Sequence, residues 1–190
     1  MAEQPQLPDS VTPAQFFEEL MPMGFAAQVQ ETGTTPPNFK IQFRLTGDGG
    51  GDWNVEVKDG KMTGAKGTAG DANLTVTLSE KDWRDAVLGR NGASLALIIP
   101  QPRPGRPDNS ARAMALKGTM GLDLAREGDP FKVEMCFNNA ATPRTVLKMK
   151  LQEYLDMQTG KLNGQEAFMT GKIKVEGDMG FLMQIAALNM

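Results

Sequence analysis

The C-terminal stretch of the chain reads Gly160-Lys-Leu-Asn-Gly-Gln-Glu-Ala-Phe-Met-Thr-Gly-Lys-Ile-Lys-Val-Glu-Gly-Asp-Met-Gly180 and continues as Phe-Leu-Met-Gln-Ile-Ala-Ala-Leu-Asn-Met190. From Met179 to Met190 it contains no charged residue. A helix over this segment carries apolar side chains on nearly every face, so one buried stripe cannot accommodate all of them. We therefore expect the segment to be covered by the core, by a partner chain or by a bound lipid.

Several earlier segments alternate apolar and polar residues, which is typical of a strand with one buried face. The clearest reads Phe39-Lys-Ile-Gln-Phe-Arg-Leu45. Short turns rich in Gly and Asp separate the first of these segments and predict antiparallel hairpins. The expected strands are 39–45, 53–57, 61–68, 74–78, 131–137, 147–151 and 172–176.

Two helices have clear start signals. Thr12 is a good N-cap, Pro13 favours the first helical position, and Gln15 completes a capping box, so a helix is expected to start there. Pro22 is expected to break or kink it. Ser79 is expected to cap a second helix that runs through Val87 and ends at Gly89.

The composition excludes several classes of function. The 190 residues carry 20 basic and 23 acidic side chains and a formal charge of -3, which argues against a nucleic-acid partner. There is no histidine and a single cysteine, so typical zinc sites and imidazole-dependent catalysis lose their usual side chains. We expect no enzyme activity, no catalytic residues, no metal and no cofactor.

The cysteine content, the first residues and the hydropathy of the chain indicate the cellular compartment in which we expect it. One cysteine allows no internal disulfide, and the first nine residues lack the features of a signal peptide, so we expect a cytoplasmic protein. No run of about 18 apolar residues exists, so no membrane span is expected. Residues 1–10 read as a flexible polar tail, and the proline-rich segment 100–110 reads as an extended loop.

Three short segments of the first half resemble three segments that follow in the same order further along the chain, which we call the internal echo. Residues 39–43 resemble 131–135, residues 74–80 resemble 147–153, and residues 115–122 resemble 175–181. One interpretation is a partial duplication that shares one sheet. The other is that amphipathic strands simply look alike, and the sequence leaves both open.

Thirteen methionines are present, and Met169, Met179, Met183 and Met190 gather near the C-terminus. Methionine is flexible and polarizable and suits surfaces that accept ligands of variable shape. These side chains read either as ordinary core filling or as the wall of a cavity.

The stretch 160–180 closely resembles the C-terminal signature of the sterol carrier protein type 2 family, the sterol-transfer domain. Segments 45–53, 57–60, 72–79 and 82–84 look like the first strands and the following helix of that family. The resemblance covers roughly 39–90 and 145–190. It implies a single domain over 11–190, in which residues 91–144 are an inserted segment that contains the echo strands.

The resemblance implies an α/β (α+β) fold in which helices cover one face of an antiparallel-dominated sheet of five or more strands around a hydrophobic tunnel. It also implies non-catalytic binding and carriage of a sterol, fatty acid, fatty acyl-CoA or phospholipid. On that pattern ten residues would line the tunnel: Trp83, Val87, Phe168, Met169, Ile173, Met179, Phe181, Leu182, Met183 and Ile185.

Two functional hypotheses follow from the same apolar helix. The first is a lipid carrier that touches membranes transiently. The alternative is a dimerisation or docking module that hides 179–190 against a partner chain, for example in a homodimer.

Overall fold

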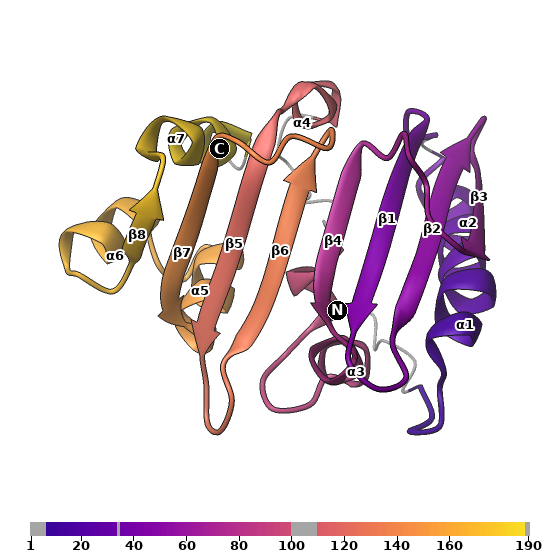
Figure 1. Cartoon of the computed structure of the whole chain (residues 1–190), viewed down its shortest axis with the longest axis horizontal. Helices are drawn as coiled ribbons and strands as arrows, with labels where there is room; N and C mark the ends of the chain where they lie inside the picture. Colours follow the sequence, from indigo (N-terminus) through magenta and orange to yellow (C-terminus); the bar gives the residue numbers. More distant parts are fainter. Residues whose placement is uncertain (1–6, 34, 100–109, 189–190) are drawn as a thin grey trace.

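A computed structural model describes residues 7–33, 35–99 and 110–188. Within these residues eight strands form one sheet in the order β3-β2-β1-β4-β6-β5-β7-β8 (Figure 1). The β1–β4 and β5–β7 neighbours are parallel, and the other described neighbours are antiparallel. The strands are β1 (Phe39–Thr46), β2 (Gly51–Lys58), β3 (Lys61–Lys66), β4 (Leu74–Ser79), β5 (Gly118–Ala125), β6 (Phe131–Phe137), β7 (Arg144–Lys150) and β8 (Lys174–Gly177).

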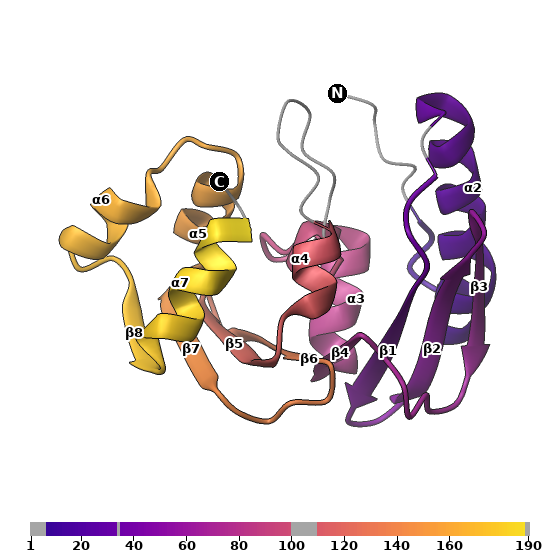
Figure 2. The same ribbon diagram turned by 90° about the horizontal axis from the view of Figure 1, so that it is seen from above.

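The helices lie on one side of this sheet, as Figure 2 shows. They are α1 (Pro13–Gln15), α2 (Met21–Thr32), α3 (Glu80–Leu88), α4 (Ser110–Ala115), α5 (Leu151–Gln158), α6 (Gly164–Met169) and α7 (Met179–Leu188), with a π-helical turn η1 (Phe16–Leu20) and a 3-10 turn η2 (Leu95–Leu97). An α+β fold with an antiparallel-dominated sheet is therefore confirmed. The polar tail predicted at 1–10 and the loop predicted at 100–110 lie largely outside the described residues.

The alternation in the sequence becomes the two faces of the sheet. In β1 the side chains of Ile41, Phe43 and Leu45 are buried and Arg44 is exposed, but Gln42, which was expected on the polar face, is also buried. The same alternation continues in β2 and β4, and the buried side chains of both halves belong to one hydrophobic core. The predicted strands thus take their places because successive side chains point to opposite faces.

The first helix begins as predicted but is not broken at Pro22. The Gln15 N–H donates to Thr12 Oγ1 at 3.2 Å, and the Thr12 N–H donates to Gln15 Oε1 at 3.0 Å. The chain remains helical through Pro22, and η1 lies directly before it. A π turn shifts the hydrogen-bond register, which accommodates a residue that has no N–H to donate.

The turn η1 also covers the edge strand β3. A Cβ added to Gly64 in β3 would lie 1.8 Å from the Phe17 carbonyl oxygen, so glycine permits the two backbones to meet. This contact lets η1 pack closely on the face of β3.

Residues 118–125 were not predicted to form a strand, yet they form β5 between β6 and β7. The first five residues of β5 are all buried, so the burial of this central strand does not alternate. Gly118, Thr119 and Gly121 interrupt the alternation on which the sequence argument depended.

Both halves of the sheet repeat one arrangement. In the first half β1 lies between β2 and β4, and in the second β5 lies between β6 and β7; α3 follows β4 and α5 follows β7. The echo correctly pairs β4 with β7. The echo also matches β1 with β6. In the sheet, however, the strand of the second half that corresponds in position to β1 is β5. The duplication itself stays a prediction.

Candidate functional site

Helix α7 begins at a sharp turn after β8. Asp178 Oδ1 accepts a hydrogen bond of 2.6 Å from the Phe181 N–H and so satisfies one free donor of the first turn. Gly177 has a φ of 97°, and a Cβ there would lie 2.3 Å from the Arg144 carbonyl oxygen. This position therefore requires glycine, which explains the Gly-Asp pair before the apolar helix.

Two buried side chains one turn apart, Phe181 and Ile185, fix α7 to the sheet. The Phe181 ring packs edge-to-face on Phe137 with a centroid separation of 6.5 Å. It also lies against Gly118, where an added Cβ would come within 2.6 Å of the ring. Gly118 in β5 thus leaves the space that the ring occupies.

The other side of α7 is exposed. Met183 is 68% exposed and Met179 is also exposed, while Leu182 is partly buried. On α6, Met169 is 78% exposed and Phe168 is half-exposed. The fold therefore covers one face of the uncharged C-terminal segment and leaves the opposite face without a covering element among the described residues.

The ten residues predicted to line a tunnel fall into three groups. Trp83, Val87, Ile173, Phe181 and Ile185 are buried in the core; Phe168, Met169, Met179 and Met183 are exposed; Leu182 is intermediate.

The structure does not gather all ten at one place. Trp83 on α3 packs on the rings of Phe16 and Phe17, at centroid distances of 5.7 and 6.1 Å, so it belongs to the aromatic cluster of the N-terminal half. Phe181 and Ile185 instead pack with the C-terminal strands.

A groove runs between α4 and α7, which lie side by side in Figure 2. Its volume is ≈ 530 Å³, compared with ≈ 420 Å³ for a second hollow in the surface. The groove is lined by Arg112, Ala115, Leu116, Gly180, Met183, Gln184, Ala187 and Leu188. The hollow is lined by Asn91, Gly92, Ala125, Arg126, Glu127, Lys150, Leu151 and Gln152. Both are open at the surface, and the tunnel stays a prediction.

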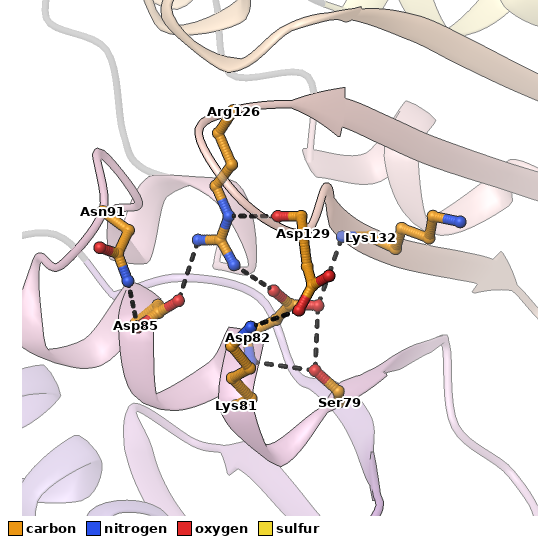
Figure 3. Close-up of polar contacts among 8 residues, drawn as sticks. All are labelled: Ser79, Lys81, Asp82, Asp85, Asn91, Arg126, Asp129 and Lys132. Atoms are coloured by element: carbon orange, nitrogen blue, oxygen red, sulfur yellow. Dashed lines mark hydrogen bonds and ion pairs between the residues drawn. The ribbon is translucent and has the colours of Figure 1, made fainter.

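A buried ionic cluster that the sequence analysis missed lies beside the hollow (Figure 3). The Arg126 guanidinium, 5% exposed, lies 2.8 Å from Asp82 Oδ1 and 3.0 Å from Asp85 Oδ2, and both carboxylates are buried. Asp82 Oδ2 accepts hydrogen bonds from Ser79 Oγ and from the N–H of Lys132. Asp82 and Asp85 lie three residues apart and so share one face of α3, a pairing that the sequence alone indicates. No local pattern, however, identifies Arg126, which directly follows β5, as the partner of these two carboxylates.

At the rim of this cluster, Lys81 Nζ donates to Asp129 Oδ2 at 2.8 Å. That hydrogen bond lowers the pKa of Asp129 and raises the pKa of Lys81. The cluster has the features of a structural joint between α3 and the second half of the sheet, because its members are paired with one another.

Within the described ranges, no group of three or more His, Cys, Asp or Glu side chains is arranged to hold a metal ion. No helix in the same ranges has the length and hydropathy that crossing a bilayer requires. The features that remain for a binding function are apolar ones around α6 and α7.

Comparison with known families bears directly on this part of the chain. Residues 101–189 match the SCP-2 sterol transfer family. The C-terminal half of the chain is an SCP-2 sterol transfer domain. The family resemblance is thereby confirmed for the C-terminal half, which includes the strands β5–β8 and the helices α4–α7, whereas the resemblance of 39–90 lies outside the match. The boundaries expected for a domain over 11–190 with an insertion at 91–144 stay a prediction.

Individual relatives match a shorter part of the chain or share a lower sequence identity with it. A segment of 46 residues is 39% identical to peroxisomal multifunctional enzyme A of Dictyostelium discoideum and covers 24% of this chain and 10% of that enzyme. Among solved structures, sterol carrier protein domain 2 of Helicoverpa armigera is 25% identical, with a TM-score of 0.36 over 43% of this chain and 73% of that chain. Sterol carrier protein 2 of Yarrowia lipolytica is 14% identical, with a TM-score of 0.23 over 93% of this chain and 81% of that chain.

Proposed function

We propose that the protein binds and carries a hydrophobic ligand, namely a sterol, fatty acid, fatty acyl-CoA or phospholipid, without chemically changing it. The observation that carries this proposal is the sterol transfer domain at 101–189. The exposed apolar face of α7 supports it, because such a surface gains free energy when an aliphatic chain covers it.

The energy available from such burial is sufficient. At about 0.8 kcal/mol per buried CH₂ group, a chain with about ten methylenes gains on the order of 8 kcal/mol before the costs of binding. No catalytic group is needed for this function. The matched multifunctional enzyme is an enzyme as a whole, but the similar segment covers only 10% of it.

We propose that the ligand lies against the α6 and α7 members of the predicted set, around Met183. Trp83 and Val87 are weaker members, because a ligand in contact with Trp83 would have to displace the rings of Phe16 and Phe17. We further propose a hydrophobic tunnel that opens next to α7, a cytoplasmic location, and transient membrane contact when the ligand is exchanged.

Native mass spectrometry of the purified protein, before and after lipid extraction, tests this function. We expect adducts in the unextracted protein that disappear on extraction and return when a fatty acid, a sterol or a phospholipid is added. A protein that carries no lipid and binds none of these classes would show that the function is wrong.

A second candidate is self-association through α7, because Met183 is 68% exposed and its helix has no charge. The double substitution Met179→Glu and Met183→Glu places two charges on this face. If the face is a dimer interface, light scattering after gel filtration shows a wild-type dimer that becomes a monomer, while Met23→Glu, on an equally exposed methionine of α2, leaves the dimer intact. A monomeric wild-type protein rejects this candidate.

A further inference from the structure

We infer that Asn91 is a site of spontaneous deamidation, and that the aspartate or isoaspartate formed there weakens the buried ionic cluster around Arg126. The inference concerns a covalent modification and does not depend on the proposed function. It rests on the turn between α3 and η2, where the side chain of Asn91 contacts Asp85, one of the two carboxylates of the cluster (Figure 3).

Two asparagines of the chain are followed by glycine, in the pairs Asn91-Gly92 and Asn163-Gly164. In such a pair the peptide nitrogen of the glycine can attack the side-chain amide carbon, because glycine has no side chain to hinder the approach. A new C–N bond closes a cyclic succinimide, the proton of the attacking nitrogen passes through solvent to the amide nitrogen, and ammonia leaves. Water then opens the ring at either carbonyl, so a neutral amide is replaced by a negative carboxylate.

The surroundings of Asn91 permit this reaction. Asn91 and Gly92 have positive φ, 51° and 74°, as the central residues of a type I′ turn do. The turn is closed by a hydrogen bond of 2.8 Å from the Ala93 N–H to the Arg90 carbonyl oxygen. Asn91 and Gly92 are both exposed and line the second hollow, which is open at the surface, so water reaches the reacting atoms.

The side chain of Asn163 is restrained by its role in α6. It is the N-cap of that helix, and its Oδ1 accepts hydrogen bonds from the N–H groups of Gln165 at 2.8 Å and Glu166 at 3.2 Å. These bonds must break before the amide can turn toward the nitrogen of Gly164, and the loss of an N-cap destabilises a helix. The same dipeptide therefore occurs in one setting that permits the reaction and in one that opposes it.

The product changes the charge balance of the ionic cluster. Asp82 and Asp85 already share the single guanidinium of Arg126. In the native turn Asn91 Nδ2 donates to Asp85 Oδ1 at 3.2 Å. A carboxylate at position 91 removes this donor and places a third negative charge beside Asp85, which repels it. Deamidation therefore loosens the connection of α3 to the second half of the sheet.

The reaction is tested on the wild-type protein, incubated at mildly alkaline pH and sampled over several weeks. Cleavage after lysine at mildly acidic pH separates the two pairs, because residues 82–117 contain Asn91 and residues 162–172 contain Asn163. Mass spectrometry with fragmentation then follows the conversion of each amide to an acid. We expect Asn91 to convert at least about five-fold faster than Asn163, which corresponds to the release of one typical N-cap. Equal rates, or faster conversion of Asn163, would overturn the inference.

The effect on the cluster is tested with substitutions that separate the new charge from the lost hydrogen bond. Asn91→Asp reproduces the product, whereas Asn91→Gly removes the same bond without a charge and tolerates the positive φ. In urea unfolding we expect Asn91→Asp to lower the folding equilibrium constant about ten-fold and Asn91→Gly at most about three-fold. The difference should shrink at high salt, which screens the repulsion.

Asn163→Asp is the matched control, because it adds the same charge at the other pair but replaces one good N-cap by another. We expect it to leave the folding equilibrium constant unchanged. If Asn91→Asp is as stable as Asn91→Gly, the carboxylate does not act on the cluster and the inference is wrong.

Discussion

At the scale of single residues, the Arg126 cluster is the most consequential feature. One guanidinium faces two buried carboxylates, and each of the three groups would be costly to bury alone. The cluster joins α3 to the end of β5, so it connects segments that are far apart in the sequence (Figure 3). Its role is to fix the position of α3 on the second half of the sheet.

This role predicts an asymmetry between the arginine and its partners. Arg126→Met leaves two uncompensated carboxylates and should lower the free energy of unfolding by about 3–5 kcal/mol. Asp85→Asn leaves Arg126 paired one-to-one with Asp82 and should cost distinctly less. Urea unfolding monitored by tryptophan fluorescence measures both; equal effects of the two substitutions would contradict the account.

The sequence predicts such residue-level features only where both partners are local. The Thr12–Gln15 capping box was predicted and is present, because its two members lie within one turn. Arg126 and its carboxylates are brought together only by tertiary structure. Local patterns contain no information on that pairing.

At the scale of elements, α7 is a helix with one buried and one exposed face. Phe181 and Ile185 attach it to the core, and Met179 and Met183 leave its opposite face open. The uncharged segment is thus neither wholly core nor wholly surface, which is why its pattern showed no single apolar stripe.

This division predicts opposite results for two substitutions on the same helix. Phe181→Ala should lower the free energy of unfolding by about 3–5 kcal/mol, because it empties the space beside Gly118 and Phe137. Met183→Ala should change it by no more than about 0.5 kcal/mol, since the side chain is mostly exposed. Thermal and urea unfolding check both values, and a large loss on Met183→Ala would show that this methionine belongs to the core.

Strands with one solvent-exposed face could be predicted from their alternation of apolar and polar residues. Elements without such a regular pattern could not. The burial of β2, β4 and β7 follows their alternation closely, whereas Gln42 in β1 is buried and β6 loses the alternation after Val133. β5 was not predicted because its first five residues are all buried and two of its eight residues are glycines. The short helices α4, α5 and α6 were also not predicted, since each makes only one or two turns and leaves too short a period to recognise.

At the scale of the whole molecule, the two halves form a single sheet. β4 of the first half pairs with β6 of the second over Leu74–Leu78, and one hydrophobic core includes residues of both. A junction of full strand length, together with the Arg126 cluster, should make the halves unfold together.

This expectation can be measured with separate probes. Both tryptophans, Trp53 and Trp83, lie in the first half, whereas the amides of β5 and β7 report on the second. Urea unfolding by tryptophan fluorescence and by hydrogen exchange of those amides should give the same midpoint. Two separate midpoints would mean that the sterol transfer domain is an independent unit.

The family, the sheet and the C-terminal helix could be predicted from the sequence, because they depend on a specific motif and on local periodicity. The groove between α4 and α7 could not, because its two sides come from separate segments that only the fold brings together. Of the residues predicted for the ligand, Met183 is the one that lines this groove. The rest of that set stays a prediction.

The central claim is that this protein binds a hydrophobic ligand, and equilibrium titration of the delipidated protein with a fluorescent fatty acid tests it most directly. The account predicts saturable binding with one ligand per chain, a negative heat-capacity change from burial of apolar surface, and loss of binding in Met183→Glu but not in Met23→Glu. Titration that never saturates, or saturable binding that Met183→Glu leaves unchanged, would contradict it.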